Sequence, residues 1–217
     1  MHPRSERPSL LKTAVTRYTE ALDEDALAYL AARGIDPNVA ATFRLGLVVE
    51  PAVGHDMFSG RLSIPYMTRA GVRTVKFRCL EDHDCAAEKC PKYLGLPGAR
   101  PYMFNPGALL EGDVVAVCEG ELDAVVCSGV VGILACGVPG VSSWKEHFPR
   151  MFAGIPRVIV IRDHDVKQEG RDPGKELSER IAKAIDRAVV VTPPAGMDLT
   201  DWVLSEGPDK VRRSCGL

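Results

Sequence analysis

Two short apolar runs that end in carboxylates constrain the fold of this chain more than any other feature. Residues 114–118 are followed by Glu119, and residues 158–161 are followed by Asp163 and Asp165. Short β-branched runs of this kind are typical of buried strands in a parallel sheet, whose carboxyl ends meet at one edge. We therefore expect the three carboxylates to gather there, where a cluster of hard oxygen ligands suits a divalent cation such as Mg²⁺.

The second half of the chain alternates between strand and helix patterns. Alternation of this kind predicts a parallel sheet flanked by helices, with ligands bound at the carboxyl ends of the strands. The predicted strands are 114–118, 131–136, 157–162 and 188–192, and the predicted helices lie near 121–129, 143–152, 174–186 and 200–205.

The first half has a different pattern, which indicates a separate domain. A helical pattern begins at Thr19, and a second short helix begins near Pro37. Residues 61–67 and 72–78 alternate around the turn 69–71, as in a β-hairpin. The predicted divisions are a flexible lead-in over 1–18, a small mixed α/β subdomain over 19–112, and an α/β domain over 113–217.

Composition indicates the expected cellular location of the protein and says little about its function. The formal net charge is −2, so a polyanion would have to bind a local basic patch. The polar first residues lack the apolar core of a secretory signal, and the longest uncharged apolar stretch, 125–138, is too short to span a bilayer. Seven cysteines, an odd number, are typical of reduced thiols, so we expect a cytoplasmic protein with no membrane partner.

Three acidic motifs in the second half resemble those of the TOPRIM domain. They are Glu119–Gly120, the triplet 163–165, and the segment 198–202, which begins with Asp198 and contains Asp201. The TOPRIM domain is shared by bacterial DnaG-type primases, type IA and type II topoisomerases and several nucleases. The resemblance implies a Rossmann-like parallel sheet with flanking helices.

Motifs in the first half are similar to the RNA-polymerase core of DnaG-type primases, in the same order. They are 29–35 with 43–46, the hairpin 60–65 with 71–77, the segment 91–94, and the aromatic segment 102–105. Members of that family carry a zinc-ribbon domain and a helicase-binding domain, for which this chain has no room. We therefore expect a replicative helicase, or a separate zinc-ribbon initiation protein, as a partner.

The resemblance implies roles for the acidic residues. Glu119 would be a metal ligand or a general base, Asp163 and Asp165 would be catalytic metal ligands, and Asp198 would be a further ligand for Mg²⁺ or Mn²⁺. Asp123 would support the site from behind. Asp201 would do the same or would cap the last helix. Glu121 is expected to face solvent, and His164 to point away from the metal.

The basic residues of the hairpin and its exit are candidates for binding nucleic acid or nucleotides. They are Arg61, Lys76, Arg78 and Lys92, and the alternative for them is a solvated hairpin face. Tyr93 would either stack on a base or be a half-buried tyrosine.

A cluster of soft ligands follows the hairpin. Cys79, His83, Cys85 and Cys90 lie within twelve residues. Structural Zn²⁺ bound to a Cys3His set is one interpretation, and unliganded or redox-labile thiols are the other.

The function that these features predict is a compact DnaG-like primase core. It would join NTPs into short RNA primers on a single-stranded DNA template, with Mg²⁺ or Mn²⁺, during phage DNA replication in the host cytoplasm. The alternatives are a metal-dependent TOPRIM nuclease and a non-catalytic nucleic-acid-binding accessory of a split primase.

Overall fold

The computed structural model describes residues 7–138, 143–164 and 172–217. These form two compact units, one comprising the residues up to Ala32 with Asp36–Arg100, and the other Arg33–Ile35 with Pro101–Leu217. The break at residue 100 lies earlier than the expected boundary near 112. Residues 101–112 belong with the second unit because Phe104 pairs with Gly137 through two backbone hydrogen bonds of 2.9 and 3.1 Å.

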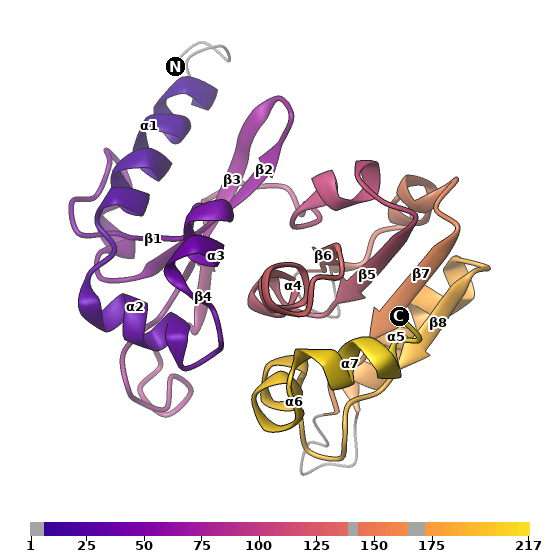
Figure 1. Cartoon of the computed structure of the whole chain (residues 1–217). Coiled ribbons are helices and arrows are strands. Elements are labelled where there is room, and N and C mark those ends of the chain that lie inside the picture. Colours follow the sequence, from indigo (N-terminus) through magenta and orange to yellow (C-terminus); the bar gives the residue numbers. More distant parts are fainter. Residues whose placement is uncertain (1–6, 139–142, 165–171) are drawn as a thin grey trace. The chain divides into compact units, whose positions relative to one another are not determined.

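The first unit is built on an antiparallel sheet with the strand order β1-β2-β3-β4 (Figure 1). Its strands are β1 (Gly46–Leu47), β2 (Leu62–Thr68), β3 (Gly71–Arg78) and β4 (Tyr93–Gly95), and its helices are α1 (Arg7–Glu20), α2 (Glu24–Ala31) and α3 (Pro37–Thr42). The predicted hairpin is present, since Leu62 faces Arg78 and Thr68 faces Gly71 across β2 and β3. The insertion 79–92 connects β3 to β4.

Helix α1 (Arg7–Glu20) occupies the described part of the segment 1–18, which the sequence predicted to be a flexible lead-in; residues 1–6 lie outside the described residues. Leu11, Ala14, Val15 and Tyr18 recur at helical spacing, and the last three are buried in the core of the first unit. Pro8 lies in the first turn, where its missing N–H removes no hydrogen bond, so it is compatible with the helix.

Helix α1 lies against strand β1 at an unusually close distance. A Cβ atom added to Gly46 would overlap the Tyr18 carbonyl group and lie 2.5 Å from the Thr19 nitrogen. These are backbone atoms, which cannot rotate away as a side chain could. Gly46 is therefore required by space, since only glycine lets the two backbones approach this closely.

We predict that Gly46→Ala lowers the free energy of unfolding of the first unit by about 2 kcal/mol or more, because the added methyl group forces backbone movement. Thermal unfolding measures the change. Gly95→Ala is the matched control, because a Cβ there meets nothing within 4 Å. Equal melting temperatures for the two variants would contradict the close approach of α1 and β1.

The second unit is built on a parallel sheet with the order β6-β5-β7-β8. Its strands are β5 (Val114–Cys118), β6 (Ala135–Gly137), β7 (Arg157–Ile161) and β8 (Ala188–Val191), and its helices are α4 (Glu121–Val126), α5 (Pro173–Ala184), α6 (Leu199–Glu206) and α7 (Pro208–Ser214). Helix α5 contacts β7 and β8, while α4 contacts β5, β6 and α6. The predicted α/β fold is confirmed.

Some element boundaries differ from the sequence prediction. Helix α4 continues as a single π-helical turn, η3 (Cys127–Val131), so β6 begins at Ala135 rather than at residue 131. The helix expected near 143–152 is, in the described part of that range, the 3₁₀ turn η5 (Phe148–Phe152). Helix α7 was not predicted. Within the described ranges, no helix is both long enough and apolar enough to cross a bilayer.

Candidate active site

Glu119 and Asp163 follow two strands that are direct neighbours. Strands β5 and β7 pair in parallel, with Val117 opposite Val160. Glu119 comes one residue after β5, and Asp163 comes two residues after β7. The two acidic residues, both half-buried, therefore lie at the same edge of the sheet.

The first turn of α5 brings these two residues together. A Cβ atom added to Gly174 would overlap the Asp163 carbonyl oxygen and lie 3.2 Å from Glu119 Oε2. One point on the helix backbone thus nearly touches both the Asp163 backbone and the Glu119 carboxylate. The N-terminus of α5, which carries a partial positive charge, therefore lies beside the Glu119 carboxylate.

Arg162 fixes the start of α5. It directly precedes Asp163 and forms an ion pair with Asp172, the N-cap residue of α5. Asp172 also accepts a hydrogen bond of 2.8 Å from the Lys175 backbone N–H. The Lys175 N–H and the Arg162 guanidinium lower the pKa of Asp172, so this carboxylate remains charged. Arg162 was not among the predicted site residues, although its place at a strand end beside the acidic motif was a signal.

The third acidic motif is joined to the second through the backbone. The His164 N–H donates to the Met197 carbonyl oxygen over 3.2 Å, and Met197 directly precedes Asp198. Asp198 is the N-cap residue of α6, since its Oδ1 accepts a 2.8 Å hydrogen bond from the Asp201 N–H. One predicted role of Asp201 was to cap this helix. In the structure Asp198 is the N-cap residue instead, and Asp201 is exposed.

Asp123 explains why a glycine follows Glu119. Its Oδ1 accepts a hydrogen bond of 3.1 Å from Thr200 Oγ1, which ties α4 to α6. Its Oδ2 lies 2.6 Å from the point where a side chain at Gly120 would begin. The spacing Glu-Gly-x-x-Asp thus lets the Asp123 carboxylate fold back over Gly120, behind Glu119.

The other residues near the acidic cluster are Glu121, His164 and Asp165. Glu121 was expected to face solvent, but it is only 3% exposed, because α4 turns this position toward the interior of the second unit. Asp165 lies outside the described residues. His164 Nδ1 lies 3.4 Å from the Pro193 carbonyl oxygen.

Negative charge at this edge also affects a buried thiol. The pKa of Cys118, the last residue of β5, is raised by its hydrogen bond with Cys127 and by burial, and further by the Asp123 and Asp163 carboxylates. Both carboxylates therefore act on the same strand end. An acidic site built in this way would be stabilised by a bound cation.

The basic residues of the first unit form a cation–aromatic surface on β3 and β4. Arg78 lies opposite Tyr93 in the strand pairing, with its guanidinium 5.1 Å from the centre of that ring. Lys76 Nζ lies 5.6 Å from the same ring. Arg78 also lies 5.5 Å from the Tyr29 ring. Tyr93 is thus engaged by two cations, as a half-buried tyrosine rather than an open platform.

Arg61 and Lys92 are placed differently from each other. Arg61 donates through Nη1 to the Pro91 carbonyl oxygen over 2.8 Å and through Nη2 to Cys90 Sγ over 3.2 Å. It therefore holds the insertion 79–92 against β2. Lys92 is exposed, and its carbonyl oxygen accepts a 3.0 Å hydrogen bond from the Cys79 N–H.

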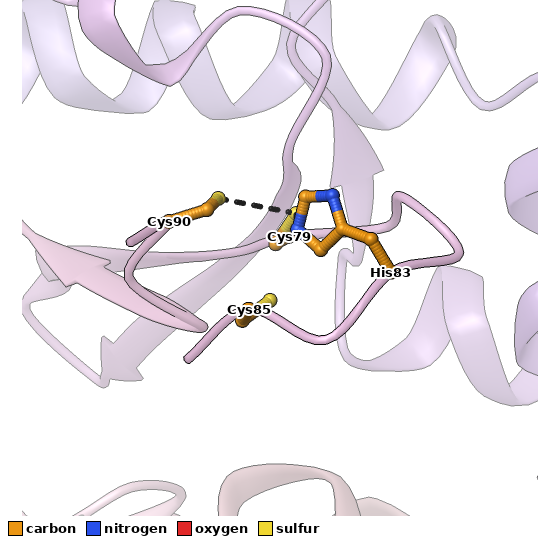
Figure 2. A group of neighbouring side chains, drawn as sticks. All are labelled: Cys79, His83, Cys85 and Cys90. Atoms are coloured by element: carbon orange, nitrogen blue, oxygen red, sulfur yellow. Dashed lines mark hydrogen bonds between the residues drawn. The ribbon is translucent and has the colours of Figure 1, made fainter. Parts of the chain in front are cut away.

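The four soft ligands of the insertion converge on one point (Figure 2). One ligand atom from each of Cys79, His83, Cys85 and Cys90 lies within 4.8 Å of the other three. Cys79 is buried, Cys85 and Cys90 are half-buried, and His83 is exposed. The seven cysteines of the chain, all within the described residues, are free thiols.

Comparison with known proteins defines the class to which this fold and site belong. Residues 114–209 match the family model described as the Toprim domain. The Aquifex aeolicus primase structure, with its zinc-binding and RNA polymerase domains, superposes with a TM-score of 0.79 at 21% identity, over all of this chain and 62% of that one. A DnaG primase catalytic domain bound to ssDNA superposes with a TM-score of 0.75 at 20% identity, over 98% of this chain and 78% of that one. The chain thus has the fold of a DnaG-type primase core with a Toprim domain, as its sequence motifs predicted.

A phage protein shows to which protein family the chain belongs. The Gene 57 protein of Mycobacterium phage D29 is 34% identical over 159 residues, which cover 70% of this chain and 96% of that protein. The chain belongs to the same family as this phage protein.

We predict that Gly174→Ala impairs the acidic site without changing any of its carboxylates. Alanine is normally preferred over glycine in a helix, but here its methyl group would displace the Asp163 backbone or the Glu119 carboxylate. Isothermal titration with Mn²⁺ should show affinity reduced by about tenfold, comparable to the loss of a residue that supports a metal ligand. Gly107→Ala is the control, because a Cβ there meets only atoms at 3.9 Å. Unchanged Mn²⁺ affinity in Gly174→Ala would contradict the role of this close approach.

Proposed function

We propose that this chain is a primase-like nucleotidyltransferase that joins ribonucleotides into short RNA primers on single-stranded DNA. The observation that carries the proposal is the meeting of Glu119 and Asp163 at neighbouring strand ends, under the first turn of α5. The fold of a DnaG-type core over the whole chain supports it.

The donor chemistry of the site fits Mg²⁺ or Mn²⁺. Glu119, Asp163 and Asp198 offer carboxylate oxygens, with Asp165 as a further candidate, and hard divalent cations prefer such ligands. Asp198 Oδ1 accepts the N-cap hydrogen bond of α6, and the Asp198 carboxylate is proposed as a further metal ligand. Bound there, a divalent ion supplies the positive charge that activates the attacking hydroxyl and offsets charge on the phosphoryl group.

Other residues are proposed to take part in proton transfer, orientation of the site and binding of phosphates. Glu119 is proposed to bind metal or to take the proton from the attacking 3′-hydroxyl, in a position held by α5. Asp123 orients the Glu119–Gly120 turn through its bond to Thr200. In the first unit, the cations of Lys76, Arg78 and Lys92 are proposed to contact template or nucleotide phosphates, which the net charge of −2 alone would repel.

The comparisons suggest the setting. One similar primase domain is described as bound to ssDNA, which supports a single-stranded template here. The relative from a mycobacteriophage supports a role in phage DNA replication in the host cytoplasm. A replicative helicase or a separate zinc-ribbon protein is the proposed partner for initiation.

We predict that Glu119→Gln and Asp163→Asn each abolish primer synthesis. Each change keeps the shape of the side chain but removes the charge required for metal binding, so the expected loss is about 10²-fold or more. The measurement is formation of short RNA from labelled NTPs on single-stranded DNA with Mg²⁺ or Mn²⁺. Asp186→Asn is the control, because this exposed carboxylate precedes β8, at the opposite end of the sheet.

The outcome separates the rival functions. Metal-dependent loss of the DNA itself, abolished by the same substitutions, would replace the polymerase by a nuclease. Absence of both activities, in a folded protein that still binds single-stranded DNA, would identify a non-catalytic accessory.

A further inference from the structure

We propose that the insertion 79–92 is a zinc site of the Cys3His type, separate from the acidic site. The ligand atoms would be Cys79 Sγ, His83 Nε2, Cys85 Sγ and Cys90 Sγ. The ion would fasten the insertion to β2 and fix the segment that carries Lys92 and Tyr93 into β4.

The separations between the ligand atoms match tetrahedral zinc. With Zn–S bonds of about 2.3 Å and Zn–N bonds of about 2.0–2.1 Å, tetrahedral geometry requires S···S distances of about 3.8 Å and S···N distances of about 3.5 Å. Cys79 Sγ lies 3.7 Å from Cys90 Sγ and 3.6 Å from His83 Nε2. Cys85 completes the set, since all four atoms lie within 4.8 Å of one another (Figure 2).

The backbone of the insertion is arranged as a closed loop around these atoms. The Cys79 N–H donates to the Lys92 carbonyl oxygen over 3.0 Å, and the Cys90 N–H donates to the Cys85 carbonyl oxygen over 2.9 Å. The Asp84 carboxylate accepts from the Ala86 N–H over 2.9 Å. These bonds bring three sulfurs and one imidazole to the inner side of a loop whose two ends are paired.

The insertion has no hydrophobic core of its own to hold this shape. Residues 81–84 and 86–89 are exposed, and Cys79 is the one fully buried residue of the segment, all of which the structure describes. Apolar burial therefore contributes little to the order of this loop, and a metal bound by its four ligand atoms would crosslink the loop.

Arg61 supplies the charge that such a site requires. Three thiolates and a neutral imidazole around Zn²⁺ leave a net charge of about −1, which is offset when a cation donates a hydrogen bond to one sulfur. Arg61 Nη2 donates to Cys90 Sγ over 3.2 Å, while Nη1 donates to the Pro91 carbonyl oxygen. Arg61 is thus a positioning residue that connects β2, the metal site and the start of β4.

The ligand set also determines which ion binds. Thiolates are soft ligands and favour Zn²⁺ over Mg²⁺ or Mn²⁺, which prefer the carboxylates of the second unit. The two kinds of metal should therefore be separable by chelation, because a thiol-competitive zinc chelator would not remove Mg²⁺ supplied in excess.

The first test is metal content and spectroscopy of the full chain, purified with reductant. We expect one Zn²⁺ per chain, and replacement by Co²⁺ should give the visible absorption of tetrahedral cobalt with thiolate charge-transfer bands. Cys85→Ser and Cys90→Ser should lose the bound zinc, Arg61→Ala should bind it about tenfold more weakly, and Asp82→Asn, an exposed carboxylate of the same loop, should be unchanged.

Several outcomes would overturn the zinc site. They are substoichiometric zinc in the reduced wild-type chain, a cobalt spectrum without thiolate bands, or a Cys79–Cys90 disulfide detected by mass spectrometry in place of bound metal. Because a cysteine variant could unfold, the wild-type chain is also stripped of zinc and reloaded with Co²⁺. Failure of the tetrahedral cobalt spectrum to appear in this unmutated chain would likewise overturn the zinc site.

The second test addresses what the zinc does, and this step rests on the proposed function. We expect removal of zinc to weaken binding of a fluorescent single-stranded oligonucleotide several-fold in excess Mg²⁺, and re-addition of Zn²⁺ to restore it. Stoichiometric zinc with unchanged DNA affinity would overturn the link to the template and leave the metal site intact. Failure of the loaded protein to bind the oligonucleotide at all would count against the proposed primase function instead.

Discussion

The parallel pairing of β5 with β7 is the constraint on which the candidate active site depends. Parallel pairing makes both strands end at the same edge, so residues that are 44 positions apart, Glu119 and Asp163, leave the sheet side by side. The rest of the site is built onto this edge. Helix α5 covers it through Gly174, and α6 joins it through Thr200 and the cap at Asp198. A change of one residue in the β5–β7 register would shift Glu119 relative to Asp163 along the strand direction by about 3.3 Å.

The sequence predicted the parts of the structure in which local pattern and tertiary packing agree. The buried runs 114–118 and 157–161 and the hairpin around Gly71 all have strong local signals. For the cluster that contains Cys79 and Cys90, the sequence left metal binding and free thiols both open. The sequence prediction was wrong where contacts between residues distant in the sequence determine the structure. Helix α1 is ordered by burial of Ala14, Val15 and Tyr18 in the core of the first unit, a contact with residues distant in the sequence. Glu121 has the local context of a solvent-facing acid, and only the packing of α4 buries it.

Glycine positions carry more information about the site than the sequence pattern suggests. Gly120 makes room for the Asp123 carboxylate, and Gly174 makes room for the Asp163 backbone beside Glu119. Neither requirement is visible in a single sequence, because each depends on how closely another element approaches. The motif Glu-Gly-x-x-Asp is therefore constrained by packing as well as by charge. Because Gly120 has no side chain, the Asp123 carboxylate can lie behind Glu119, the proposed metal ligand.

The hard carboxylate ligands lie in the second unit and the soft cysteine and histidine ligands lie in the first. The two sets suit different metal ions. Carboxylates gather at the parallel-sheet edge, and the proposed Mg²⁺ there would bind loosely and keep open positions for phosphate oxygens. Cysteine thiols and an imidazole gather in the insertion after β3, and the proposed Zn²⁺ there would be a structural ion that stays bound. Arg61 would then serve the zinc site first, through Cys90, and the phosphates only indirectly. The proposed nucleic-acid surface then consists of Lys76, Arg78 and Lys92, and Arg61 is proposed to determine how rigidly that surface is held.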